Sequence, residues 1–204
     1  LVEKKRITLE ESTDIQGRIV RSTQIDLFEG CDLVVEAVVE NLDVKHSVFK
    51  QIENIVSSDC IVASNTSSLS ITSLAAGCNH PERVVGLHFF NPAPLMPLVE
   101  IVPAIQTSED TPLHLVSLMK NWGKSPVIAK DTPGFIVNRV ARPFYGEALR
   151  ILDEGIADVP TIDIVMRSLG FKMGPFQLMD LIGHDVNYAV TESVFKSFYC
   201  DPRF

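Results

Sequence analysis

Cysteine is scarce in this 204-residue chain, and the four cysteines, Cys31, Cys60, Cys78 and Cys200, form no C-x-x-C pair. No cluster of histidine and cysteine has the spacing of a zinc site, so we expect no metal centre. Three of the thiols lie in or beside apolar runs. They therefore read as reduced structural cysteines, which is typical of a cytoplasmic protein.

Basic charge is also limited, with 18 Lys and Arg against 26 Asp and Glu and a net charge of −8. Nucleic-acid binding depends on neutralising phosphates, and the short cluster Lys4-Lys5-Arg6 reads as the solvated face of a helix. No apolar run approaches the roughly 18 residues of a membrane span, and we recognise no signal peptide. We expect neither a nucleic acid nor a membrane as a partner.

The chain also lacks G-x-G-x-x-G, the glycine loop that normally opens a dinucleotide-binding fold in its first βα turn. This absence has two interpretations. Either the chain does not form that fold, or it begins after the loop.

Strand and helix patterns alternate through the first two thirds of the chain. This alternation predicts a doubly wound parallel sheet of the α/β class. The predicted strands cover 18–22, 32–38, 60–64, 83–90, 98–103 and 125–129, and 32–38 reads as buried on both faces. The predicted helices cover 44–55, capped by Asn41 or Asp43, then 65–74 and 108–122.

After Ala129 the strand pattern disappears. Four predicted helices follow at 135–155, 160–169, 175–182 and 186–198, separated by glycines. We place a domain boundary near Asp131–Thr132, with a sheet domain over 1–131 and an all-helical domain over 132–204. Neither domain reads as complete, since the first lacks its front part and the second stops early.

Polar residues follow three of the predicted strands directly, at Glu40, at Ser64–Ser67 and at His88–Asn91. Ligands of open α/β sheets bind at the carboxyl ends of the strands, where these groups would meet. The sequence therefore predicts a site on this rim.

The strand that ends in His88 is joined to the strand that holds Glu100 by a connection with three prolines. If the two strands pair, the carboxylate reaches the imidazole, orients it and raises its basicity. Such a pair is a general base for work near neutral pH. On spacing alone, a partly buried histidine beside an unrelated carboxylate stays open as the alternative.

A set of long motifs then resembles the L-3-hydroxyacyl-CoA dehydrogenase family, in matching order from Asp32 to Phe198. The motifs are Val-Val-Glu-Asn-Leu at 38–42, Ala-Ser-Asn-Thr-Ser-Ser-Leu at 63–69, Gly-Leu-His-Phe-Phe-Asn-Pro at 86–92, Leu-Val-Glu at 98–100, Asp-Thr-Pro-Gly-Phe-Ile-Val-Asn-Arg at 131–139 and Met-Gly-Pro-Phe at 173–176. The segment 180–190 further resembles the 3-hydroxybutyryl-CoA or phenylacetate-pathway branch.

The resemblance implies a Rossmann-like domain, a helical dimerisation domain and oxidation of (S)-3-hydroxyacyl-CoA to 3-oxoacyl-CoA with NAD. It implies a homodimer and an acyl-CoA substrate. By matching motif, His88 is the catalytic base and Glu100 its partner, while Ser67 and Asn138 hold the substrate oxygen and the histidine. The motif match also assigns cofactor contacts to Glu40, Lys45, Ser67 and Asn91.

Each of these residues also has a structural interpretation. Ser67 would cap a helix, Asn138 would pack in a domain interface, Lys45 would be solvated, and Asn91 would shape the turn before Pro92.

Two other functions stay open. A hydrolase would use Ser67, His88 and Glu100 as a triad, although no G-x-S-x-G elbow is present. A non-catalytic dimerisation or binding fragment would explain the missing glycine loop.

Overall fold

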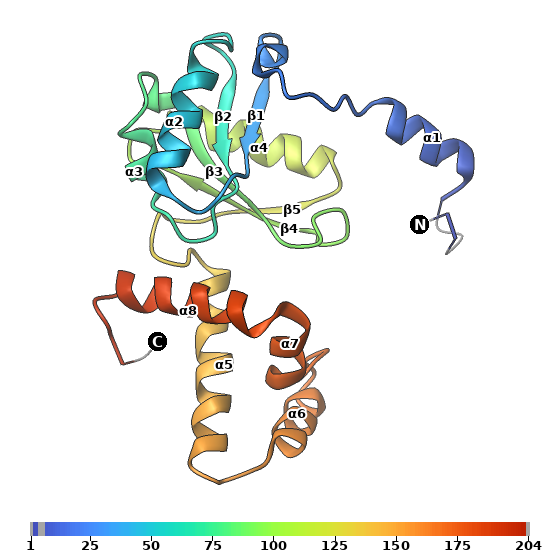
Figure 1. Ribbon diagram of the computed structural model, residues 1–204, viewed down its shortest axis with the longest axis vertical. Helices are drawn as coiled ribbons and strands as arrows, with labels where there is room; N and C mark the ends of the chain where they lie inside the picture. The colour runs from blue at the N-terminus through green and yellow to red at the C-terminus, as the bar shows by residue number, and fades with distance from the viewer. Residues whose placement is uncertain (1, 4–6, 203–204) are drawn as a thin grey trace.

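In the computed structural model, which describes residues 2–3 and 7–202, the chain forms a sheet domain and a helical domain (Figure 1). The cluster Lys4-Lys5-Arg6 lies outside the described residues. The first helix, α1 (Leu9–Gly17), buries no residue and stands apart from the sheet domain. None of the described helices combines the length and the apolar character that a bilayer span requires.

The sheet has five strands in the order β1-β2-β3-β4-β5. Their bounds are Leu33–Glu36, Ile61–Ser64, Val84–Phe89, Leu98–Pro103 and Ser125–Ile128. The first three strands are parallel, as predicted, whereas β4 runs antiparallel to β3 and β5 runs parallel to β4. The short connection between β3 and β4 has no room for a crossover helix, so it returns the chain in the opposite direction.

Helices cover both faces of the sheet, which makes it doubly wound. On one face, α2 (Leu42–Glu53) and α3 (Ile71–Ala75) contribute Phe49, Ile52, Ile71 and Leu74 to a core with inward residues of β1 to β4. On the other face, α4 (Asp110–Asn121) packs its apolar side chains on β2, β3 and β4. Asn41 caps α2, as predicted, by accepting a hydrogen bond from the backbone N–H of Val44.

Three local predictions were wrong. Residues 18–22 form an exposed extended segment and no strand; a 3-10 turn, Ile25–Phe28, follows. Strand β1 is not buried on both faces, since Val35 is 38% exposed. The helix predicted over 65–74 begins only at Ile71, where Ser70 is its N-cap, because the polar side chains before it make local hydrogen bonds that compete with helix formation.

The helical domain contains α5 (Val137–Asp153), α6 (Val159–Ser168), α7 (Pro175–Ile182) and α8 (His184–Ser197), close to the predicted ranges. Its core consists of Tyr145, Ala148, Ile162, Phe176 and Met179. Helix α8 crosses α5 at the end that faces the sheet domain (Figure 1). The predicted boundary at Asp131–Thr132 lies in the segment between β5 and α5.

That segment is fixed to the sheet domain. The carboxylate of Asp131 accepts hydrogen bonds from the Ser70 hydroxyl and from the backbone N–H groups of Ile71 and Thr72. Four residues further on, Phe135 is buried in the core beneath α2 and α3. The position of α5 is therefore tied to the sheet from its first residue.

Candidate active site

His88 and Glu100 face each other across two paired strands. They are register partners in the antiparallel ladder of β3 and β4, and His88 Nδ1 lies 2.7 Å from Glu100 Oε2. The Glu100 carboxylate accepts the Nδ1 proton, which leaves the Nε2 lone pair as the basic position of the ring. The contact that the sequence predicted is therefore present.

Glu100 is fully buried and remains a carboxylate. Burial by itself raises the pKa of Glu100, but hydrogen bonds from His88 and from the backbone N–H groups of Val137 and Ile136 together bring this pKa below its ordinary value. The side chain is thus a permanent negative charge against the imidazole.

The same carboxylate joins the two domains. Its other oxygen, Oε1, accepts the backbone N–H groups of Ile136 (2.9 Å) and Val137 (3.0 Å) at the start of α5. One residue later, Asn138 donates from Nδ2 to the backbone carbonyl of Ser67 at 3.2 Å. The first turn of α5 is thereby held over the rim of the sheet.

A pocket of about 340 Å³ opens between this rim and the helical domain. His88, Ser67, Asn91 and Asn138 line it, so the structure brings four of the predicted site residues to one cavity. The remaining lining residues are Asn65, Phe89, Phe90, Arg142, Ile182, Val186, Asn187 and Val190.

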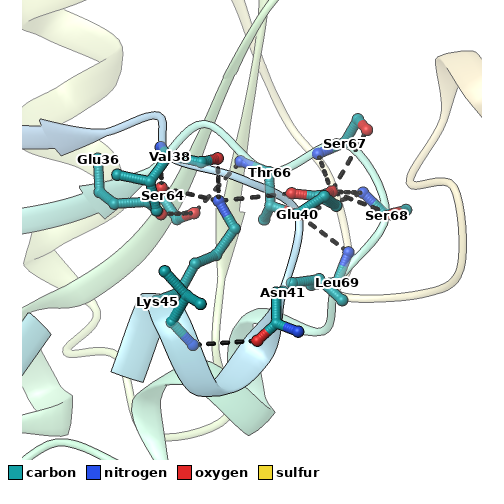
Figure 2. Close-up of polar contacts among 11 residues, drawn as sticks. Glu36, Val38, Glu40, Asn41, Lys45, Ser64, Thr66, Ser67, Ser68 and Leu69 are labelled. Atoms are coloured by element: carbon teal, nitrogen blue, oxygen red, sulfur yellow. Dashed lines mark hydrogen bonds and ion pairs between the residues drawn. The ribbon is translucent and has the colours of Figure 1, made fainter. Parts of the chain in front are cut away.

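Glu40 organises the loop after β2 (Figure 2). Its Oε1 accepts hydrogen bonds from the Thr66 hydroxyl (2.6 Å), from the Ser68 hydroxyl (3.0 Å) and from the backbone N–H groups of Ser67 (3.1 Å) and Ser68 (3.2 Å). Burial by itself raises the pKa of Glu40, but these donors and the charge of Lys45 lower it overall. Glu40 therefore stays ionised and fixes the backbone at Ser67.

Lys45 is buried, with 1% of its surface exposed, so the solvated interpretation was wrong. Its ammonium donates to Glu36 Oε1 at 2.7 Å and to the Val38 carbonyl at 3.3 Å, and it lies 3.4 Å from Glu40 Oε2. The second oxygen of Glu36 accepts the Ser64 hydroxyl at 2.7 Å (Figure 2). The sequence reasoning placed Ser64 on the rim but missed its partner Glu36, for which an acid inside an apolar strand was the available signal.

Two other interpretations are settled by contacts. Ser67 does not cap α3, since Ser70 does so. Nor does the Ser67 hydroxyl bond to His88 within the described part of the chain; it lies 3.4 Å from Glu40 Oε1 instead. The hydrolase hypothesis needs a nucleophile bonded to its base, and this arrangement lacks that bond.

Asn91 precedes Pro92 through a cis peptide bond and lines the pocket.

We expect Glu100→Gln to slow any reaction in which His88 takes up a proton, because the imidazolium that forms loses its counter-charge. We also expect the acidic limb of the pH–rate profile to shift, because the variant lacks the ionised carboxylate that faces the base. The profile of kcat/KM against pH measures this shift. An unchanged profile in a folded variant contradicts a catalytic role for the pair.

The structure thus joins a doubly wound sheet to a helical domain and places a histidine–carboxylate pair at the ligand-binding edge of the sheet, in the pocket between the two. Residues 1–132 match the family model of the 3-hydroxyacyl-CoA dehydrogenase NAD binding domain, and residues 134–204 match that of the C-terminal domain. The chain belongs to the 3-hydroxyacyl-CoA dehydrogenase family.

The chain is similar to dehydrogenases that are named for different 3-hydroxyacyl-CoA substrates. It is 47% identical over 204 residues to 3-hydroxyadipyl-CoA dehydrogenase of Escherichia coli, covering all of this chain and 43% of the relative. It is 42% identical over 193 residues to the probable 3-hydroxybutyryl-CoA dehydrogenase of Deinococcus radiodurans, covering 94% and 69%. The crystal structure of (S)-3-hydroxybutyryl-CoA dehydrogenase from Ralstonia eutropha superposes with a TM-score of 0.93 at 42% identity, covering 100% and 72%.

The chain spans less than two thirds of some relatives: it covers 43% of the Escherichia coli protein and 62% of a mitochondrial hydroxyacyl-coenzyme A dehydrogenase from Sus scrofa, to which it is 48% identical.

Proposed function

We propose that the protein oxidises (S)-3-hydroxyacyl-CoA to 3-oxoacyl-CoA with NAD, using His88 as the general base. The observation that carries the proposal is the 2.7 Å contact between His88 and the buried Glu100 carboxylate, at the edge of a pocket between the two domains. Family membership supports the substrate class.

In this proposal His88 Nε2 takes the proton of the substrate hydroxyl as a hydride leaves the carbon that bears this hydroxyl. NAD, when bound, supplies the acceptor for that hydride. Glu100 stabilises the imidazolium that results, and its low pKa keeps it ionised during the step. A base positioned in this way contributes about 10²–10⁴-fold to a rate.

The residues present fit the nicotinamide half of NAD. Val38 and Val39 are exposed just past β1, 41% and 66% respectively, and offer an apolar surface for a flat ring next to Glu40. The Asn91 amide lines the adjoining pocket. We assign Glu40 and Asn91 to direct cofactor contact, with Ser67 at the boundary between cofactor and substrate.

Lys45 and Asn138 support these groups. The Lys45 ammonium faces Glu36 and Glu40, so we assign it to holding Glu40 in place beside the cofactor. Asn138 bonds to the backbone of Ser67 and lines the pocket with His88, which supports our assignment of its amide to holding the substrate oxygen against the base.

The direct test is 3-hydroxybutyryl-CoA with NAD, monitored by the absorbance of NADH. Formation of NADH by the protein supports the proposal. Thioester hydrolysis without NAD, or the absence of turnover with any 3-hydroxyacyl-CoA, contradicts it. A folded protein that binds the thioester without turnover corresponds to the non-catalytic alternative.

We further propose a homodimer formed through the helical domain. Apolar residues of α5 to α8 lie exposed there, among them Val140, Ile164, Leu169 and Leu181, each more than half exposed. Sedimentation equilibrium is expected to give twice the monomer mass, and a charged substitution at Leu181 is expected to weaken the association.

All four cysteines are free, which fits a cytoplasmic location.

A further inference from the structure

Arg142 is a buried cation that pairs with no acid in the described part of the chain. It lies on α5 and is 7% exposed. Its Nη1 donates to Asn187 Oδ1 (2.7 Å), to the Thr191 hydroxyl (2.9 Å) and to the Asn187 carbonyl (3.2 Å). All three acceptors are neutral, and burying a charge without an opposite charge is costly.

The guanidinium also keeps free donors. Nε is buried and has no hydrogen-bond partner, and Nη2 makes no hydrogen bond within the described residues. The planar face of the group lies over Tyr145, with Cζ 4.9 Å from the ring centroid. Neutral contacts therefore hold the group in place while leaving part of its fork unused. Arginine forks bind carboxylates with two parallel hydrogen bonds.

The position of Arg142 relates it to the reacting groups. It follows Asn138 by four residues on α5, so both side chains lie on one face of the helix. Both line the pocket that contains His88 and Ser67, and no Asp or Glu is among the described residues that line it. Ile182, Val186 and Val190 complete an apolar wall. The pocket thus combines a base, an apolar wall and a cation.

We propose that Arg142 binds a carboxylate at the end of the substrate's acyl chain, so that the protein selects 3-hydroxyacyl-CoA thioesters of dicarboxylic acids. This inference rests on the proposed function and specifies its substrate. The turn of helix from Asn138 to Arg142, about 5–6 Å between Cβ atoms, matches a spacer of about two to four methylene groups between the hydroxyl carbon and the carboxylate.

Two observations support an acyl carboxylate over the other anions of the ligands. The groups that share the pocket with Arg142 are those that handle the substrate hydroxyl, so the cation lies at the reacting end of the thioester and not at its nucleotide end. Burial lowers the pKa of Arg142, an effect that the nearby Tyr145 opposes, and no carboxylate contributes to this balance. An incoming carboxylate would supply the missing counter-charge.

The test compares two unreactive thioesters, adipyl-CoA and hexanoyl-CoA, which differ only in a terminal carboxylate in place of a methyl group. Titration calorimetry on the wild-type protein is expected to show about 10- to 100-fold tighter binding of adipyl-CoA, the range for hydrogen bonds to a charged group. Arg142→Gln is expected to abolish this preference while changing hexanoyl-CoA binding little. Arg150→Gln removes an exposed arginine from the same helix and is expected to keep the preference.

Equal binding of the two thioesters by the wild type overturns the inference without any variant. So does an Arg142→Gln protein that loses both ligands alike, because the contact would then be to the CoA portion or purely structural. If Arg142→Gln fails to fold, Arg142→Lys keeps the charge and is expected to retain part of the preference for adipyl-CoA. A folded Lys variant that loses affinity for both thioesters to the same degree overturns the inference.

The reaction assay separates this inference from the proposed function. If the protein forms NADH equally well from 3-hydroxyadipyl-CoA and 3-hydroxyhexanoyl-CoA, the proposed dehydrogenase function is supported and only the role of Arg142 is contradicted. NADH formed from neither substrate removes the proposed function itself.

Discussion

Replacing His88 with glutamine is expected to lower kcat by about 10²–10⁴-fold, the contribution of a positioned general base. Glutamine is similar in length, but its amide lies where the ring has Nε2, so the side chain must turn to donate a hydrogen bond to the buried Glu100 carboxylate in place of Nδ1. The side chain no longer takes up a proton. The loss should therefore fall on the chemical step, and NADH formation at saturating substrate measures it.

His114→Gln is the matched control for this experiment. His114 is an exposed residue of α4 on the outer face of the sheet domain, so the same chemical change there should leave turnover unaltered. Circular dichroism melting curves show whether each variant is folded. Near-normal turnover in a folded His88→Gln protein would remove His88 from the mechanism.

Replacing Lys45 with methionine is expected to destabilise the sheet domain by about 3–5 kcal/mol. This is the cost of removing one partner of a buried ion pair, because the other charge stays buried without a counter-charge. Methionine fills much of the same volume, so cavity formation contributes little. Glu36 would keep the Ser64 hydroxyl and the Val38 N–H but lose its counter-charge in a site that excludes water. Urea unfolding of the variant measures the change in free energy.

Lys50→Met on the same helix is the control, since Lys50 is exposed and its loss should change stability by less than about 0.5 kcal/mol. The double variant Glu36→Gln/Lys45→Met removes both charges and should be less destabilised than the two single changes added together. If Lys45→Met weakens NAD binding at unchanged stability, Lys45 is a cofactor ligand and not a support for Glu40.

The order of elements was predictable from the sequence because apolar runs and proline-rich connections are local signals. The same signals placed His88 and Glu100 on adjacent strands, which made their contact foreseeable. The start of α3 was harder to place, since the backbone N–H groups of Ser67 and Ser68 bond to Glu40, more than 25 residues earlier in the chain, in addition to the local bonds to Thr66. Local propensity contains no information about such a partner.

The buried charges were unpredictable for the same reason. From the local pattern alone, Lys45 kept a solvated interpretation beside its motif assignment to the cofactor, because its partner Glu36 lies on a strand outside the helical pattern that contains the lysine. Arg142 is held by Asn187 and Thr191, which are 45 and 49 residues away on another helix. Only the tertiary structure brings these groups together.

Glu100 has a wider consequence, because its two oxygens bind different parts of the molecule. One oxygen accepts a hydrogen bond from the imidazole, and the other accepts hydrogen bonds from the first backbone amides of α5. A rotation of the helical domain away from the sheet would displace the side chain that orients the imidazole ring. Any such movement would therefore change the orientation of the ring through Glu100, so the position of the helical domain and the readiness of His88 to take up a proton depend on the same side chain.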